Sequence, residues 1–201
     1  MNDTNGKSKM TLREHLNILD QNATVTEQEK ERLVNVLRKK LKSLGYPNVW
    51  KVAGQKKRNP EKSQECLNLL REYVDLIFKT QDNRCSFYLP TTGNQLNGLW
   101  NRPQAAFKDW KKDNIVYEID HVVPVNAGGK DVLENYQFLS ANANQFTKTS
   151  LTYEDLLRRV DLSDALKDRI RTVLSRRKEL FVSKQWKQLM TRFDNMEKSL
   201  I

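Results

Sequence analysis

One short extended run constrains the fold most, because it breaks off abruptly inside a chain that is otherwise patterned for helices. Tyr117–Pro124 reads as an apolar strand, and the polar pair Asp120 and His121 lies where that strand should end. Pro124 supplies no backbone N–H to a strand ladder, and the loop after it holds two successive glycines. Neighbouring strand residues point to opposite faces, so the strand must bend or end here if this pair is to act on one ligand.

Helical patterns lie on both sides of this run, where apolar residues recur at helical spacing. The helix that starts at Pro60 should continue to about Lys79, and Gly45 should end the helix before it. Residues 83–100 read instead as short extended segments and turns, with Cys85–Leu89 as a candidate strand. The predicted caps and first residues of the helices are Thr11, Thr26, Asn59 with Pro60, Ser163 and Ser183.

The charge of the chain is unevenly spread. The sequence carries 35 lysines and arginines against 25 aspartates and glutamates, a formal net charge of +10. Residues 113–150 hold five of the acidic side chains and only two of the basic ones. A cation site favours carboxylates, whereas positively charged flanks neutralise phosphates. This distribution is the one that an enzyme acting on nucleic acid needs.

Several protein classes are not favoured by the composition. No apolar run approaches the roughly twenty residues of a membrane span, and the first residues lack a secretory pattern, so we expect a cytoplasmic protein without a membrane partner. Cys66 and Cys85 form no C-x-x-C pair, so no cysteine zinc site is expected and both thiols should be reduced. His15 has no acidic or metal-ligand residues near it in the sequence, which favours a packing or surface role over a catalytic one.

Three polar residues supply the groups that phosphodiester hydrolysis requires. Imidazole titrates closer to neutral pH than other side chains, which makes His121 the candidate general base. Asp120 offers a charged oxygen to Mg²⁺ and Asn144 a neutral one, and two protein ligands suffice because Mg²⁺ keeps waters or substrate oxygens. Asn142 fits the spacing less well. Taken singly, such residues are common turn and cap residues, which is the alternative interpretation without catalysis.

The order and spacing of these residues carry a family resemblance. His121 is followed fourteen residues later by Asn135 and nine residues after that by Asn144. The segment Glu118–Lys148 resembles the HNH endonucleases, also called His-Me finger or ββα-metal nucleases, and among them the HNH domains of RNA-guided CRISPR nucleases. The resemblance covers roughly a sixth of the chain. Asn144 stands where the commonest pattern has histidine, a variant that favours an all-oxygen cation site.

The resemblance implies a ββα-metal core, with a second strand over Tyr136–Leu139 and a helix from about Ala141 that carries the second metal ligand. It also implies that Asn135 braces the loop and keeps His121 oriented. We therefore predict an α+β protein, in which a two-stranded hairpin plus helix is embedded in a mostly α-helical chain. The predicted regions are an N-terminal helical region (1–82), the nuclease core (83–150) and a basic C-terminal helical region (151–201).

The function implied is Mg²⁺-dependent hydrolysis of double-stranded DNA, with Mn²⁺ as a substitute ion and with 5′-phosphate and 3′-hydroxyl products. A sequence-specific enzyme of the type II restriction kind is the first expectation, because the helical flanks exceed what a minimal non-specific nuclease needs. The alternatives are a phage or mobile-element nicking or homing nuclease, an RNA-directed nuclease, and a non-catalytic DNA-binding protein with a decayed nuclease core.

Further contacts with DNA are expected outside the four motif residues. Basic faces of the C-terminal helices are candidates, whereas Lys56-Lys57-Arg58 reads first as a solvated loop. Lys148 is a weaker candidate for a phosphate contact, against the alternative of a solvent-facing lysine at a helix end. A homodimer would suit cleavage of both strands, because each chain carries one site, although no stretch of the sequence marks an interface.

Overall fold

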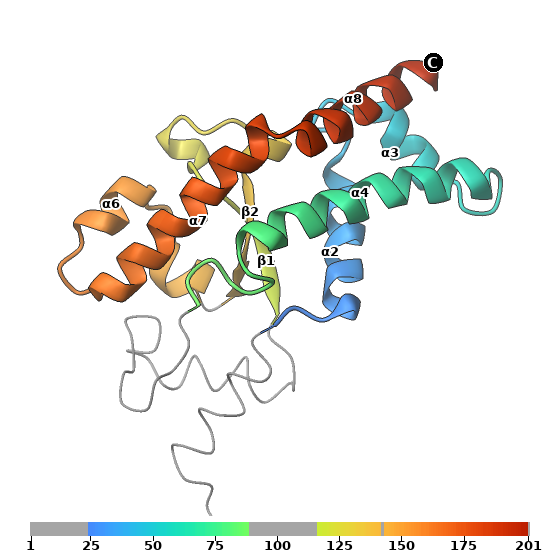
Figure 1. Ribbon diagram of the computed structural model, residues 1–201. Helices are drawn as coiled ribbons and strands as arrows, with labels where there is room; N and C mark the ends of the chain where they lie inside the picture. The colour runs from blue at the N-terminus through green and yellow to red at the C-terminus, as the bar shows by residue number, and fades with distance from the viewer. Residues whose placement is uncertain (1–23, 89–115, 142, 201) are drawn as a thin grey trace, which may run out of the picture.

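The computed structural model describes residues 24–88, 116–141 and 143–200. Within these ranges the protein is mostly helical and contains one two-stranded antiparallel sheet (Figure 1). The predicted α+β class is confirmed at this level. None of the described helices is long and apolar enough to cross a membrane.

The helices begin close to where the sequence predicts them. Thr26 Oγ1 accepts a hydrogen bond from the backbone N–H of Glu29, and Ser163 and Ser183 cap their helices in the same way. Asn59 is an exception, because its side chain makes no capping hydrogen bond and only the proline after it behaves as expected. The helices are α2 (Glu27–Lys40), α3 (Pro47–Ala53), α4 (Pro60–Thr80), α6 (Tyr153–Arg158), α7 (Asp164–Val182) and α8 (Lys184–Ser199).

The sheet pairs β1 (Tyr117–His121) with β2 (Tyr136–Ser140). Tyr117 lies opposite Ser140, and His121 lies opposite Tyr136, so β1 ends at the histidine as predicted. The connection contains two 3-10 turns, η2 (Val125–Ala127) and η3 (Leu133–Asn135), and β2 is followed by a π-helical segment, η4 (Ala143–Lys148). The second strand and the helical segment after it therefore occur where expected, but η4 is a short π-helix rather than an α-helix.

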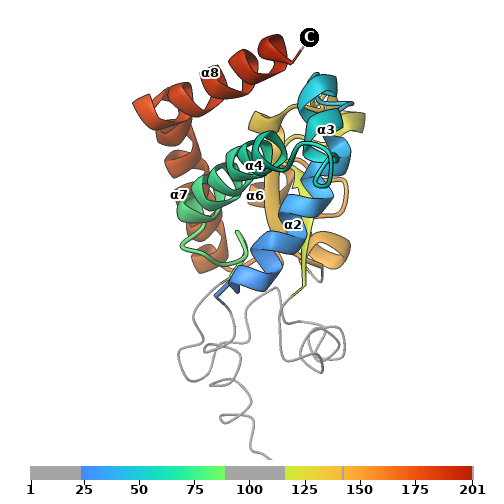
Figure 2. The same cartoon turned by 90° about the vertical axis from the view of Figure 1, so that its right-hand side faces the viewer.

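The core lies between the sheet and the helices on its two sides (Figures 1 and 2). Phe78 of α4 stacks on Phe138 of β2 with ring centroids 4.7 Å apart and meets Tyr117 edge-on at 5.2 Å. The hydroxyl of Tyr153, on α6, donates a hydrogen bond to Gln137 from the other face of the sheet. Residues from all three predicted regions contribute to one buried apolar cluster, which holds the hairpin rigidly against the helices.

Part of the predicted organisation is wrong or lies outside the described residues. Cys85–Tyr88 form a turn, so the strand predicted there is wrong over these residues, and burial of the Cys85 Sγ beside the Ser140 N–H explains why the segment is apolar. Both cysteines are buried and free. The helix predicted from Thr11, with His15, and the extended segments predicted over 89–100 fall outside the described ranges.

Candidate functional site

The alternation of side chains along β1 divides the predicted site residues between two faces of the hairpin. Glu118 and Asp120, two residues apart, share one face. His121 points to the other face, with Ile119, and its ring lies 5.0 Å from the ring of Tyr136 on β2. The strand ends at this histidine, but no bend within the strand brings the Asp120 and His121 side chains to the same side.

The acidic face of β1 is covered by η4. Asn144 Nδ2 donates a hydrogen bond of 2.7 Å to Glu118 Oε2, and Gln145 Nε2 donates one of 3.0 Å to the other carboxylate oxygen. Lys148, about one turn further along the π-helix, places its Nζ 3.8 Å from Asp120 Oδ2. Three residues of η4 therefore contact two residues of β1, and Asn144 and Asp120 lie on the same side of the hairpin.

Asp120 and Lys148 form a buried pair. The Lys148 side chain is 0% exposed and the Asp120 side chain 13% exposed, which excludes the alternative of a solvent-facing lysine. Burial raises the pKa of Asp120 above its ordinary value, although the Lys148 charge and a 2.8 Å hydrogen bond from Gln137 Nε2 act against this shift. Burial likewise lowers the pKa of Lys148, and the Asp120 charge opposes it. The lysine also donates to the carbonyl oxygen of Leu151.

His121 is held by a residue that the sequence did not single out. Its Nε2 lies 2.9 Å from Asp131 Oδ1, which also accepts a hydrogen bond from the Tyr136 hydroxyl. Partial burial raises the pKa of Asp131, but the hydrogen bonds from Tyr136 and His121 outweigh it, so the pKa lies below its ordinary value and the group is a carboxylate. A carboxylate acceptor favours the tautomer with hydrogen on Nε2, which leaves the Nδ1 lone pair free to accept a proton.

Asn135 closes the loop that follows His121. Its Oδ1 accepts a 2.9 Å hydrogen bond from the N–H of Val123, while its Nδ2 donates to the carbonyl oxygens of Val123 (2.8 Å) and Lys130 (2.9 Å). Gly129 is required by this closure, because a Cβ at that position would lie 1.8 Å from the Val123 carbonyl oxygen. Gly128 adopts a left-handed φ of 86°. The Asn135 side chain therefore braces the loop, as the resemblance implies.

The structure thus brings together only part of the predicted set. Asp120 and Asn144 share a face, Asn135 braces the loop, and His121 lies on the opposite face. Sequence reasoning missed Glu118 and Asp131. The i, i+2 relation between Glu118 and Asp120 is a signal that could have revealed the first. No local pattern marks Asp131, because its approach to His121 depends on how the intervening loop folds.

The donor set suits a hard cation. Asp120 and Asn144 offer a carboxylate and an amide oxygen, and the amide nitrogen of Asn144 is turned toward Glu118, which leaves its oxygen without a hydrogen-bond donor among the described residues. Over residues 24–88, 116–141 and 143–200 no group of three or more histidine, cysteine, aspartate or glutamate side chains is arranged to hold a metal ion.

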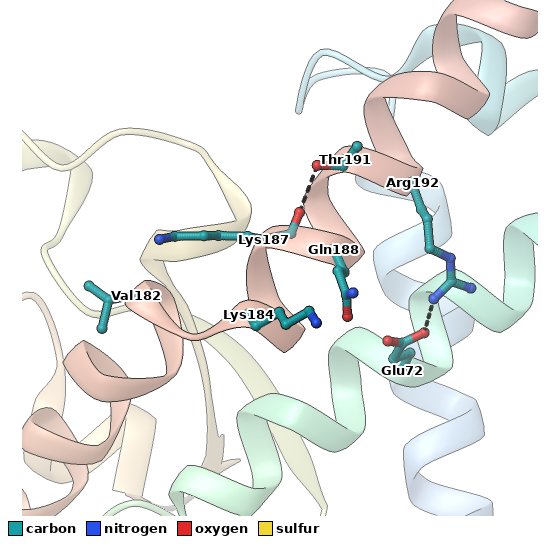
Figure 3. Close-up of a pocket in the computed structure, with 7 residues that line it drawn as sticks. All are labelled: Glu72, Val182, Lys184, Lys187, Gln188, Thr191 and Arg192. Atoms are coloured by element: carbon teal, nitrogen blue, oxygen red, sulfur yellow. Dashed lines mark hydrogen bonds and ion pairs between the residues drawn. The ribbon is translucent and has the colours of Figure 1, made fainter.

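A large surface hollow lies elsewhere, where α8 meets α4 (Figure 3). It has a volume of about 760 Å³, and the ion pair between Arg192 and Glu72 spans it from one helix to the other. Lys184 and Lys187 also line it. None of the predicted site residues contributes to this hollow, so it gives no support to the candidate site.

The comparisons with known proteins add no assignment. The chain matches no protein-family model, no curated protein and no solved structure. Its function therefore has to be argued from its own residues.

Proposed function

We propose that this protein is a Mg²⁺-dependent endonuclease that hydrolyses phosphodiester bonds of double-stranded DNA. The observation that carries the proposal is the hairpin with η4, which carries a charged oxygen (Asp120) and a neutral oxygen (Asn144) on one face, an imidazole held by Asp131 (His121) on the other, and a brace (Asn135) in its loop. The basic flanks supply the attraction for a polyanion.

His121 is the proposed general base. With Nε2–H held by Asp131, the free Nδ1 takes a proton from a water molecule as the water oxygen attacks phosphorus. The bond between phosphorus and the 3′ oxygen breaks, and the departing oxygen takes a proton from a second water molecule, so the products carry 5′-phosphate and 3′-hydroxyl ends. The His121 side chain is 24% exposed, which leaves the imidazole accessible to a substrate. Asp131 acts here as a positioning residue, because it fixes the tautomer and the ring without touching the phosphate.

Asp120 and Asn144 are the proposed ion ligands. Bound Mg²⁺ would neutralise charge on the reacting phosphate and on the leaving oxygen. For Asp120 to bind Mg²⁺, the Lys148 ammonium group would have to move away from the carboxylate, because it lies beside the oxygen that would hold the ion. The freed ammonium group would then be available to a phosphate oxygen, which gives Lys148 a role in the cycle.

The end of β1 is where one ligand could contact side chains from both faces of the hairpin. A phosphate lying on either face would contact His121 or Asp120 but not both. A phosphate seated across the strand end, where the alternation stops, is within reach of residues on both sides. The proposal therefore requires the DNA backbone to cross the tip of β1 rather than to lie on the sheet.

Cleavage of supercoiled plasmid tests the proposal directly. Wild-type protein should nick or linearise the plasmid with Mg²⁺ or Mn²⁺ and should be inactive with EDTA. His121→Ala should lower the rate by about 10²- to 10⁴-fold, the usual contribution of a general base. His15→Ala, at the other histidine of the chain, is the matched control and should cleave normally. Equal rates for the two variants would remove the proposed base.

Cleavage products would distinguish the finer possibilities. Discrete fragments indicate a sequence-specific enzyme of the type II restriction kind, whereas a single nick or a rare cut site indicates a phage or mobile-element nicking or homing nuclease. Smearing excludes sequence specificity. Preference for structured or single-stranded RNA would favour the RNA-directed alternative.

A second candidate function is supported by the same two contacts of Asp120 and His121. Lys148 already neutralises Asp120, and His121 faces away from both proposed ligands, which is the arrangement expected of a nuclease core that has lost its activity. Such a protein would bind DNA tightly and in a salt-sensitive way but would cut nothing with any divalent cation. The plasmid assay separates the two candidates.

A further inference from the structure

A long stretch of net positive charge joins α2 to α4. Residues 38–62 contain nine lysines and arginines and a single acidic residue, Glu61. This segment runs from the last turn of α2 through α3 to the first turn of α4. Glu197 of α8 reaches this segment, where its carboxylate accepts hydrogen bonds from the N–H groups of Asn48 and Val49, but the segment still carries an excess of positive charge.

Part of this segment encloses a pocket. Arg38 of α2 faces Gly54 and the turn 55–58, and together they line a hollow of about 620 Å³, which we call the basic pocket. A Cβ on Gly54 would lie 3.5 Å from Arg38 Nη1, so the guanidinium lies against the backbone of the turn. The side chains of Lys56, Lys57 and Arg58 around it are exposed.

The cations of the basic pocket are not held in close ion pairs by described residues, although Arg71 and, after it, the charge of Lys56 help to lower the pKa of Glu31. Among the described residues, neither Arg38 nor the triplet Lys56-Lys57-Arg58 forms an ion pair. Arg38 Nε is buried and has no hydrogen-bond acceptor there. A buried donor without an acceptor is costly, and a phosphate oxygen that drew the guanidinium outward into the pocket would give this donor an acceptor.

The start of α4 adds backbone donors to the same place. Asn59 makes no side-chain cap, so it supplies no acceptor to the first N–H groups of this 21-residue helix, and the positive end of the helix dipole faces the turn before it. An uncapped helix start beside unpaired cations is suited to an anion with several acceptor oxygens.

The basic pocket is linked to His121 through α2. Lys40, on the same last turn as Arg38, places its ammonium group 5.6 Å from the ring centroid of Tyr136, whose hydroxyl donates to the aspartate that holds His121. At 100° per residue, the exposed Lys39 lies between Arg38 and Lys40 on the outer surface of the helix. Figures 1 and 2 show the end of α2 and the turns after β1 at the same end of the molecule.

The C-terminal helices, the predicted location of DNA contacts, offer fewer free charges. Arg169 and Arg176 of α7 both pair with Asp82, and Arg171 pairs with Asp168. Arg177 is buried and donates to backbone carbonyl oxygens. On α8, Arg192 pairs with Glu72 (Figure 3). Many of the arginines there stabilise the fold instead of remaining available to a ligand.

We infer that the basic pocket and its exposed triplet bind two or three neighbouring backbone phosphates of duplex DNA, and that the DNA backbone crosses the last turn of α2 between this pocket and the tip of β1. The inference rests on the proposed function for the identity of the ligand, but not on catalysis. It changes the interpretation of Lys56-Lys57-Arg58 from a solvated loop to a DNA contact.

The test measures duplex binding by fluorescence anisotropy in EDTA, where no cleavage occurs, at a series of salt concentrations. The pocket variant combines Lys56→Gln, Lys57→Gln and Arg58→Gln. The rival variant removes equal charge from the C-terminal helices through Lys178→Gln, Lys184→Gln and Lys187→Gln. Since each phosphate contact contributes about 0.9 to the slope of log K against log salt, the pocket variant should reduce the slope by about 2 to 3, and the rival by less than one. The affinity of the pocket variant for the duplex near 0.1 M salt should fall by roughly tenfold or more.

Each outcome decides the inference. An unchanged slope for the pocket variant, a larger loss for the rival variant, or retention of duplex RNA with no affinity for duplex DNA would overturn it. If the triple variant unfolds, Arg58→Gln alone should reduce the slope by about one. A pocket-dependent slope in a protein that never cleaves plasmid would support the pocket and refute the nuclease. Cleavage by a protein whose binding does not depend on the pocket would support the nuclease and refute the pocket.

Discussion

Replacing Asn135 by alanine should open the loop that follows His121. The Asn135 side chain accepts one hydrogen bond and donates two, all between 2.8 and 2.9 Å, and together they tie Val123 to Lys130. One intramolecular hydrogen bond stabilises a protein by about 0.5 to 1.5 kcal/mol, and bonds near the surface contribute at the lower end of this range. Their loss therefore costs about 2 kcal/mol of unfolding free energy. For a chain of this length the melting temperature should fall by about 4 to 8 °C.

Chemical denaturation and amide hydrogen exchange measure this effect. Asn126→Ala is the matched control, because Asn126 is exposed in the same loop and its side chain makes no hydrogen bond with a described residue. Asn135→Ala should lose protection at the Val123 amide, and a nuclease carrying it should cleave about 10- to 100-fold more slowly because the histidine is less well positioned. A loss below about 0.5 kcal/mol with full protection at Val123 would refute the assigned brace.

Three further substitutions give distinct outcomes. Gly129→Ala should destabilise the protein by about 2 to 4 kcal/mol in a denaturation curve, because its Cβ would lie 1.8 Å from a carbonyl oxygen; wild-type stability would contradict the loop geometry. Two arginines of α7 lower the pKa of Asp82 despite its partial burial, so the stability that they contribute is present above the ordinary aspartate pKa and is lost as pH falls through the lowered value. Asp82→Asn should flatten this acid dependence of the unfolding free energy, and an unchanged profile would exclude the pair as its source. Lys148→Met should tighten Mn²⁺ binding by roughly tenfold in a titration, because the ammonium group no longer competes for Asp120, and weaker binding would show that the lysine does not occupy the place of the ion.

Local patterns in the sequence predicted much of the scaffold. Capping residues and apolar periodicity located the starts of α2, α7 and α8, and Pro60 located the start of α4. The end of β1 at His121 followed from the proline and glycines after it. These features depend on residues close together in the chain, which is why they could be predicted without knowledge of tertiary contacts. The strand predicted at Cys85 failed because its apolar residues are buried by a turn that packs against β2.

The candidate site was less predictable because it depends on contacts between distant residues. That Lys148 would be buried against Asp120 could not be read from a lysine near the end of a helical segment, since the contact requires η4 to cross the acidic face of β1. The approach of Asp131 to His121 likewise depends on the shape of a loop. The strand alternation was recognised in the sequence, but whether the strand would bend at Asp120 could be decided only by the structure, which places the two side chains on opposite faces.

The most direct test counts bound Mn²⁺ and times plasmid cleavage on the same samples of the wild-type protein, His121→Ala and Asp120→Ala. Separate roles for the base and the ligand predict that His121→Ala binds the ion as the wild type does but cleaves about 10²- to 10⁴-fold more slowly. Asp120→Ala should lose both ion binding and cleavage. Undiminished cleavage by His121→Ala, or undiminished ion binding by Asp120→Ala, would contradict the account.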